Sequence, residues 1–222
     1  MTSNSLDVLE RLSPVVPSAL AARADAWGDR DQPVAPSVSA SVVLLREVDG
    51  ELQTYLLHRH ARMPFAASMV VFPGGRVDPG DEVEGVRPVR RCALRETEEE
   101  TGVRLADADL HDWAHWVTPE LEPRRYDTRF YVAALPDGQQ ARDISGETDR
   151  AVWTRPSVAL AQFGRGELAL MPPTCSILME LADASRLSTV LELAHGRQIH
   201  RVLPRLERTG HGWAFRYPQV TR

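Results

Sequence analysis

Hydrophobic residues along the chain fall into short β-type runs and longer segments with helical character. The stretch 38–60 contains two runs rich in Val and Leu on either side of Asp49-Gly50, a dipeptide typical of tight β-hairpin turns. A third apolar run, 68–72, ends at a proline followed by two glycines. The pattern therefore predicts a hairpin and then a strand that leads into a glycine loop.

The segment 89–101 favours helix, and Gly102 predicts its end because glycine readily adopts the left-handed conformation that closes helices. Further strands are expected at 113–117, 129–135, 151–154 and 198–206, and further helices at 158–170, 174–184 and 188–196. Strands and helices do not alternate strictly. We therefore expect an α+β fold, an α/β/α sandwich with a mixed central sheet between helices and extra C-terminal helices.

The domain organisation follows from length and composition. A chain of 222 residues corresponds to one domain at ~150 residues per domain, with room for appendages. Residues 1–37 are rich in Pro, Ser and Ala and predict an N-terminal arm with one short helix around 17–27 and little chemistry. Residues 38–222 are expected to form the domain, with a helical extension toward the C-terminus.

Charge, cysteines and hydropathy exclude several function classes. The chain carries 26 basic and 31 acidic residues, a net charge of −5, so it offers no basic field for polymeric nucleic acid. Cys92 and Cys175 lack the spacing of a disulfide scaffold or a structural zinc module. Asp7 and Glu10 stand where a signal peptide needs positive charge, and no apolar stretch approaches the ~20 residues that span a bilayer. We expect a cytoplasmic protein with no membrane partner.

The most informative segment is the acidic run at 95–102. On a helix, Glu96, Glu99 and Glu100 share an arc of ~100°, whereas Glu98 points away from them. Arg95 precedes Glu99 by four positions and can neutralise and orient it. One face of the predicted helix is therefore acidic.

Like charges at these spacings repel, so the arrangement costs stability unless a cation compensates. Clustered carboxylate oxygens suit Mg²⁺ or Mn²⁺. A solvated acidic face is the simpler explanation of such a charge run. Upstream, Gly74 and Gly75 allow the backbone to approach a ligand closely, although the same residues also suit an ordinary turn.

The run GGRVDPGD followed by LRETEEETGV resembles the signature of Nudix hydrolases, G-x5-E-x7-R-E-U-x-E-E-x-G-U with U aliphatic. The second half of this signature matches six positions: Arg95, Glu96, Glu99, Glu100, Gly102 and Val103. Thr97 stands at an aliphatic position, and Asp81 replaces the first Glu. Thirteen residues instead of seven separate Asp81 from Arg95, an insertion of six residues.

The resemblance extends beyond the signature, over about residues 38–185. The segment before the signature looks like that of coenzyme A diphosphatases. The runs HWVTPELEPRRYDTRFYVAAL and FGRGELALMPPTCSILMELA resemble a branch related to acyl-coenzyme A diphosphatases. The resemblance implies a Nudix fold and metal-dependent hydrolysis of a nucleoside diphosphate derivative.

The resemblance also implies roles for individual residues. Glu96 and Glu100 would be direct metal ligands, with the Gly74 carbonyl as a further ligand. Glu99 would be a ligand or the base that orients water, supported by Arg95. Glu147, outside the signature, is a second candidate for the base or a metal ligand, and a structural role is equally open.

Arginines are the candidates for binding the anionic substrate, beside the backbone of Gly75. Arg124 and Arg125 could grip phosphates through bidentate hydrogen bonds, or they could fix their loop through a local ion network. Arg59 and Arg62 precede the glycine loop and could meet a phosphate or remain solvated.

Coenzyme A or its thioesters are the first expectation for the substrate. ADP-ribose or reduced dinucleotides come second and oxidised nucleoside triphosphates third. A non-catalytic Nudix module that senses a nucleotide is the alternative from another class. The expected partner is a small nucleoside diphosphate derivative, and a homodimer is left open.

Overall fold

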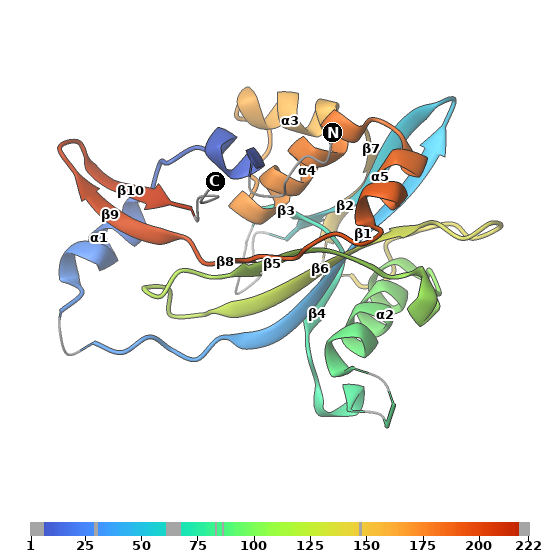
Figure 1. The fold of residues 1–222 in the computed structure, drawn as a ribbon, viewed down its shortest axis with the longest axis horizontal. Helices are drawn as coiled ribbons and strands as arrows, with labels where there is room; N and C mark the ends of the chain where they lie inside the picture. Colours follow the sequence, from blue (N-terminus) through green and yellow to red (C-terminus); the bar gives the residue numbers. More distant parts are fainter. Residues whose placement is uncertain are drawn as a thin grey trace.

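A mixed β-sheet forms the centre of the molecule, and helices cover both of its faces (Figure 1). The computed structural model describes residues 7–28, 31–60, 68–82, 84–85, 87–146 and 148–217. The α-helices are α1 Ser18–Ala26, α2 Pro88–Thr101, α3 Pro156–Gly164, α4 Pro172–Ala184 and α5 Leu187–Ala194. The strands are β1 Ser37–Val48, β2 Glu51–Arg59, β3 Val70–Val71, β4 Gly74–Arg76, β5 His111–Val117, β6 Tyr126–Ala134, β7 Thr148–Thr154, β8 Arg201–Val202, β9 Arg205–Thr209 and β10 Gly212–Arg216.

Strand β1 is the axis of the sheet, whose main path runs β3-β2-β1-β6-β5-β8. It pairs antiparallel with β2 and β4 and parallel with β6, while β7 adds to β2. The β1–β2 hairpin turns at Asp49 and Gly50, both of which have positive φ, 52° and 76°. This is the backbone that the Asp-Gly dipeptide favours, so the predicted hairpin is confirmed.

Alternate residues of the central strands contribute to separate buried clusters on the two faces of the sheet. Val42 and Tyr131 pack with Ala93 of α2 on one face, and Val43 packs with Leu178 of α4 on the other. Successive side chains of a strand point to opposite faces, which lets one strand serve both layers. The expected α+β sandwich, with a mixed sheet between helices and extra C-terminal helices, is confirmed.

Part of the described segment before β1 packs into the larger core. Val8, Leu9 and Leu12 are all buried in that core. Val15 forms an isolated β-bridge with Ala214, so the two ends of the described chain lie side by side (Figure 1).

Two expected elements differ in extent from the structure. The helix expected at 158–170 ends with α3 at Gly164, because Gly166 takes a positive φ of 72° and breaks the helical path. The closing strand expected at 198–206 is split around Pro204, which has no N–H to donate to a strand partner. Strand β8 joins β5, whereas β9 leaves the sheet and forms a hairpin with β10.

Among the described helices, none is both long and apolar enough to cross a membrane.

Candidate functional site

Helix α2 holds the acidic residues in a fixed register. It begins with Pro88 in its first turn and ends at Gly102, whose left-handed φ of 71° matches the predicted stop. Thr97 and Thr101 are fully buried. Their hydroxyls donate to the carbonyls four residues earlier, at 2.7 and 2.6 Å. The buried threonine stripe therefore fixes which face of α2 turns outward.

The three glutamates of the acidic face differ in exposure. The Glu99 side chain is 57% exposed and that of Glu96 is 16% exposed. Glu100 is buried. Burial raises the pKa of Glu96, and the hydrogen bond and charge of Arg95 oppose this only in part. Glu98 lies apart from this group and pairs with Arg104 at 2.6 Å, as its position on the helix predicts.

The glycine loop packs directly on this acidic face. The Gly74 N–H donates to Glu100 Oε2 at 2.8 Å. A Cβ at Gly75 would lie 2.2 Å from Glu96 Oε1, closer than any side chain tolerates. Glycine at 75 therefore lets the loop pack against Glu96 in its present position. The close approach to a ligand that the sequence suggested for Gly74 and Gly75 stays a prediction.

Arg95 is the electrostatic centre of the site. Its guanidinium donates to both Asp81 oxygens at 3.0 and 2.9 Å, to Glu96 at 2.8 Å and to Glu99 at 2.9 Å. Asp81 is fully buried. Burial alone would raise the pKa of Asp81, but the hydrogen bonds from Arg95 and from the Asp78 N–H outweigh it and lower that pKa. Asp81 therefore anchors Arg95, which in turn orients two glutamates.

The donor set suits a hard divalent cation in its chemistry. Glu96, Glu99 and Glu100 supply carboxylate oxygens on one helix face, and the Gly74 backbone lies against them. Within the described ranges, no three acidic, His or Cys side chains stand in a ready-made metal cluster. Arg95 lies between Glu96 and Glu99 and contacts one oxygen of each carboxylate, so the second oxygen of each is left to bind a cation while Arg95 holds the first.

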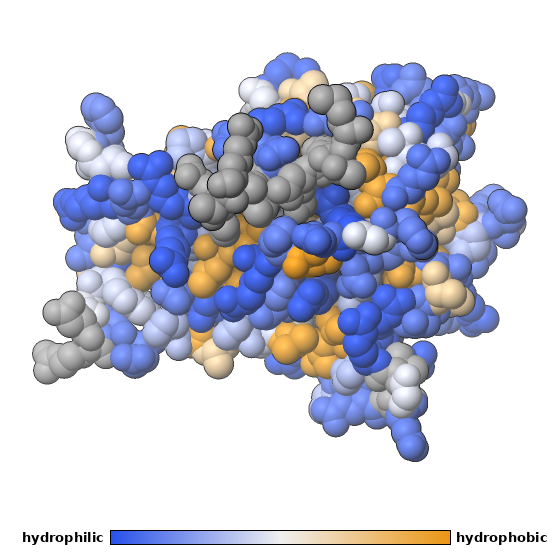
Figure 2. Space-filling view, in the orientation of Figure 1, coloured by the Kyte–Doolittle hydropathy of each residue, from blue (hydrophilic) through white to orange (hydrophobic). Residues whose placement is uncertain are grey.

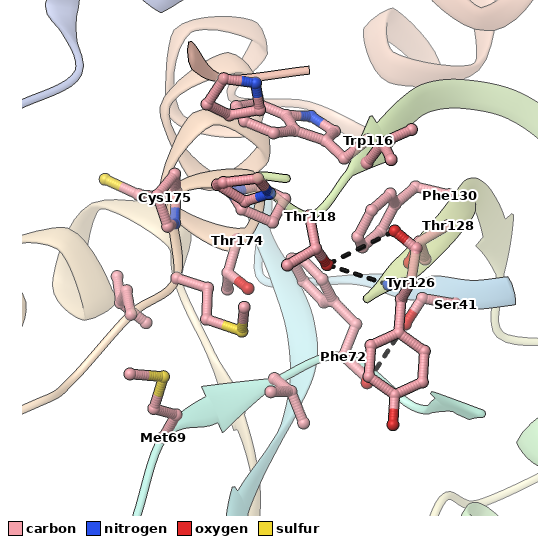
Figure 3. Close-up of a pocket in the computed structure, with 18 of the residues that line it drawn as sticks. Ser41, Met69, Phe72, Trp116, Thr118, Tyr126, Thr128, Phe130, Thr174 and Cys175 are labelled. Carbon is pink, nitrogen blue, oxygen red and sulfur yellow. Dashed lines mark hydrogen bonds between the residues drawn. The ribbon is translucent and has the colours of Figure 1, made fainter. Parts of the chain in front are cut away.

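A pocket of about 730 Å³ opens beside the glycine loop (Figure 3). Gly74 and Gly75 line it, together with two arginines, Arg59 and Arg76. The Nε of Arg59 is buried and donates to no acceptor among the described residues. A buried guanidinium N–H without a partner is costly, so the part of the pocket beside Arg59 is suited to an anion.

The structure sorts the other arginine candidates. Arg125 is buried and donates to the backbone carbonyls of Thr118 and Val34, at 3.1 and 2.7 Å. These contacts tie a loop together through neutral backbone carbonyls, where the sequence had suggested either phosphate binding or a local ion network. Arg124 is exposed. Arg62 and Glu147 lie outside the described residues, so their predicted roles stay predictions.

Two features of the site were not predicted from the sequence. The role of Asp81 as the anchor of Arg95 depends on a contact across fourteen positions. The far wall of the pocket includes Leu12, Leu20 and Phe215, which come from the two ends of the described chain. The helical spacing of apolar residues in LDVLERL was a signal that the arm packs onto something, but it did not say onto what.

Comparison with known proteins identifies the family. A model of the NUDIX domain matches residues 35–171, which is more than half of the chain. The chain therefore belongs to the Nudix family.

Curated relatives are similar to part of the chain. Acyl-coenzyme A diphosphatase NUDT19 of Homo sapiens is 31% identical over 114 residues, which cover 49% of this chain and 30% of that protein. Putative nudix hydrolase 7 of Caenorhabditis elegans is 27% identical over 164 residues, 58% of this chain and 55% of that protein. The chain thus spans about a third to half of the length of these relatives.

Solved structures share the fold. A NUDIX hydrolase from Alicyclobacillus acidocaldarius has a TM-score of 0.63 at 24% identity and covers 72% of this chain and 96% of its own. The NUDIX domain of Shewanella oneidensis NrtR, solved with ADP ribose, has a TM-score of 0.52 at 17% identity, over 76% of this chain and 97% of its own. At these identities the likeness concerns the fold alone.

Proposed function

We propose that the chain is a metal-dependent hydrolase that cleaves the diphosphate linkage of a nucleoside diphosphate derivative, with coenzyme A or an acyl-coenzyme A as the first candidate. The observation that carries the proposal is the packing of the Gly74–Gly75 loop on Glu96 and Glu100 at one end of a large pocket. The similarity to the human acyl-coenzyme A diphosphatase supports the choice of substrate.

Nudix hydrolases generally use divalent metal ions. In this chain Glu96, Glu99, Glu100 and the Gly74 carbonyl would hold Mg²⁺ or Mn²⁺, which when bound supplies positive charge for the diphosphate oxygens. Glu99 is the most exposed of the three carboxylates and is placed to orient water or accept its proton. Arg95 acts as a positioning residue, because its guanidinium contacts protein carboxylates on three residues.

Two described arginines line the pocket, Arg59 and Arg76, and we assign the phosphate contact to Arg59. Its buried Nε lacks a partner among the described residues. A charge-assisted hydrogen bond to phosphate would satisfy this donor. We do not assign Arg125 to the phosphate, because it is buried and its Nε and Nη1 donate to backbone carbonyls.

A panel of diphosphates tests the proposal. Purified protein is incubated with Mg²⁺ and, separately, with coenzyme A, acyl-coenzyme A, ADP-ribose, NADH and oxidised nucleoside triphosphates, and the products are identified by mass. Cleavage of coenzyme A to 3′,5′-ADP and phosphopantetheine supports the first candidate. Preference for ADP-ribose or NADH by about tenfold in kcat/KM, a difference of ~1.4 kcal/mol, would contradict the coenzyme A branch but leave the hydrolase proposal intact.

The same panel separates an enzyme from a nucleotide sensor. Binding of one of these compounds without cleavage, with any of the metals tried, would favour the sensing module. Loss of cleavage in Glu100→Gln, with cleavage retained in Glu98→Gln, excludes a contaminating activity. The two variants are matched because both remove one carboxylate charge from the same helix.

A further inference from the structure

The pocket beside the glycine loop continues into an apolar chamber that the nucleotide chemistry does not use. Its apolar lining includes Phe72, Trp116, Phe130 and Leu170 and side chains from the two ends of the described chain. Figure 3 shows Met69, Phe72, Trp116 and Phe130 around one space, with Cys175 of α4 at its left side. A lining of this kind favours an apolar ligand group.

The outer wall of the chamber lies outside the segment that matches the Nudix family. Leu12, Val15 and Leu20 come from before residue 35, and Phe215 and Tyr217 come from after residue 171. We propose that these terminal segments form a specificity wall that binds an apolar chain, the acyl chain of a coenzyme A thioester, while the diphosphate lies at the glycine loop. This inference rests on the proposed function and adds the substrate class and the residues that select it.

Backbone and ring contacts hold the specificity wall in place. Val15 pairs with Ala214 in a β-bridge, and the Phe215 N–H donates to the Pro14 carbonyl at 2.8 Å. The Tyr217 ring meets the Trp116 ring edge-on, with centroids 6.1 Å apart. The wall is therefore tied both to itself and to strand β5 of the central sheet.

The charges of the pocket set the direction in which a substrate lies. Arg59 and the glycine loop, which packs on the glutamates of α2, form a charged part of the pocket lining. Leu12, Val15 and Phe215 belong to its apolar part. A substrate with a charged diphosphate and an apolar tail matches this division, because the charged group meets Arg59 and the tail is removed from water.

Exposed apolar residues in the lining favour an acyl chain over a second sugar or nucleoside in the chamber. Val15 is 73% exposed although it lines the pocket, and Phe163 is 36% exposed. Covering these side chains with methylene groups gains free energy, whereas ribose hydroxyls would lose their hydrogen bonds to water there. Hydrophobic surface also reaches the outside at the base of the β9–β10 hairpin (Figure 2).

A series of thioesters tests the wall. The kcat/KM is measured for coenzyme A and its acetyl, hexanoyl, octanoyl and dodecanoyl thioesters, each below its critical micelle concentration. We expect kcat/KM to rise with chain length and to be at least about tenfold higher for the dodecanoyl thioester than for coenzyme A, a ratio that fewer than two fully buried methylenes supply. A ratio near one would overturn the inference.

Variants then locate the preference. Val15→Asp places a charge in the wall and leaves the backbone bridge to Ala214 intact, and Val15→Ser is a milder second change. Val48→Asp is the matched control, because Val48 is an exposed valine at the end of β1 and away from the pocket. In both Val15 variants the dodecanoyl-to-coenzyme A ratio of kcat/KM should fall at least about fivefold, with the wild-type ratio kept in Val48→Asp. An unchanged ratio in both folded Val15 variants would refute the assignment of the wall.

Binding without turnover separates this inference from the proposed function. Calorimetric titration in EDTA compares coenzyme A with its dodecanoyl thioester, and the thioester should bind at least about tenfold more tightly with a more negative heat-capacity change. Binding in EDTA that strengthens with chain length, together with no hydrolysis of any thioester when Mg²⁺ is present, would support the wall and refute the hydrolase. Hydrolysis of coenzyme A with no chain dependence in rate or binding would refute the wall and leave the hydrolase standing.

Discussion

Substitution of Gly75 by alanine tests the contact between the glycine loop and the acidic helix. An added Cβ would lie 2.2 Å from Glu96 Oε1 and 2.3 Å from its Cδ. Ordinary contact begins at 3.4 Å, so the carboxylate must move by about 1.2 Å, the difference between 2.2 and 3.4 Å. The obstructing atoms are the end of a flexible side chain, so Glu96 can move without unfolding the loop.

The size of the effect follows from what Glu96 does. Its carboxylate also accepts a hydrogen bond from Arg95 at 2.8 Å, so a shift of this size disturbs the position of Arg95 as well. A displacement of ~1 Å in a catalytic arrangement costs ~10²-fold in rate. We therefore expect Gly75→Ala to lower kcat/KM by about 10²-fold on the preferred diphosphate, with little change in the melting temperature.

Gly80→Ala is the matched control. Gly80 lies on the same segment, and a Cβ there would meet no atom within 4 Å. Both variants are assayed with Mg²⁺ on the same substrate, and unfolding is followed by circular dichroism. Wild-type activity in both Gly75→Ala and Gly80→Ala would show that the position of Glu96 does not matter. An equal loss of activity in both variants would place the cause in the loop itself.

Three further predictions concern individual charges. Glu99→Gln or Glu100→Gln should lower kcat by at least ~10²-fold and Glu98→Gln should not, as steady-state rates will show; equal loss at Glu98 would contradict the assignment of the acidic face. Asp81→Asn should cost ~1.5–3 kcal/mol of unfolding free energy at pH 7 in urea titrations, because Asp81 is buried and bonded to Arg95. The pKa of Asp81 is lowered in the folded state, so this stabilisation is present above the ordinary value of 3.8 and is lost as the pH falls through the lowered value; a deficit that persists at lower pH refutes it. Arg197→Met should lower the free energy of unfolding by ~3–5 kcal/mol, because it leaves Glu180 buried without its partner at 2.7 Å. Arg208→Met, at the exposed pair with Asp25, should lower it by less than ~1 kcal/mol. Similar losses in both variants would show that burial does not decide the strength of these ion pairs.

The parts of the fold that depend on local residue patterns were predictable. The Asp49-Gly50 dipeptide predicted the β1–β2 hairpin turn. The segment 89–101 was predicted to be helical, and it forms most of α2. The azimuths of Glu96, Glu99 and Glu100 followed from the helix alone. Local geometry decides all of these, so neighbours in sequence carry the necessary information.

Contacts between distant segments were not predictable. The anchoring of Arg95 by Asp81 spans the irregular insertion in the Nudix signature. Arg125 matched a phosphate-binding role as well as it matched the loop contacts that it makes. A guanidinium suits either partner, so only the position of Thr118 and Val34 in space distinguishes the two roles.

The β-bridge between Val15 and Ala214 makes the pocket depend on a contact between residues that are far apart in the sequence. It joins residues separated by nearly the whole described chain, and closing so long a loop carries a large entropic cost. Neither residue of the bridge belongs to the Nudix-matched segment, 35–171. We expect local opening at the bridge to uncover the chamber and to leave the glutamates of α2 in place. Hydrogen exchange at the Phe215 amide, which donates across this closure, therefore reports how often the pocket opens, and a bound acyl chain should slow that exchange.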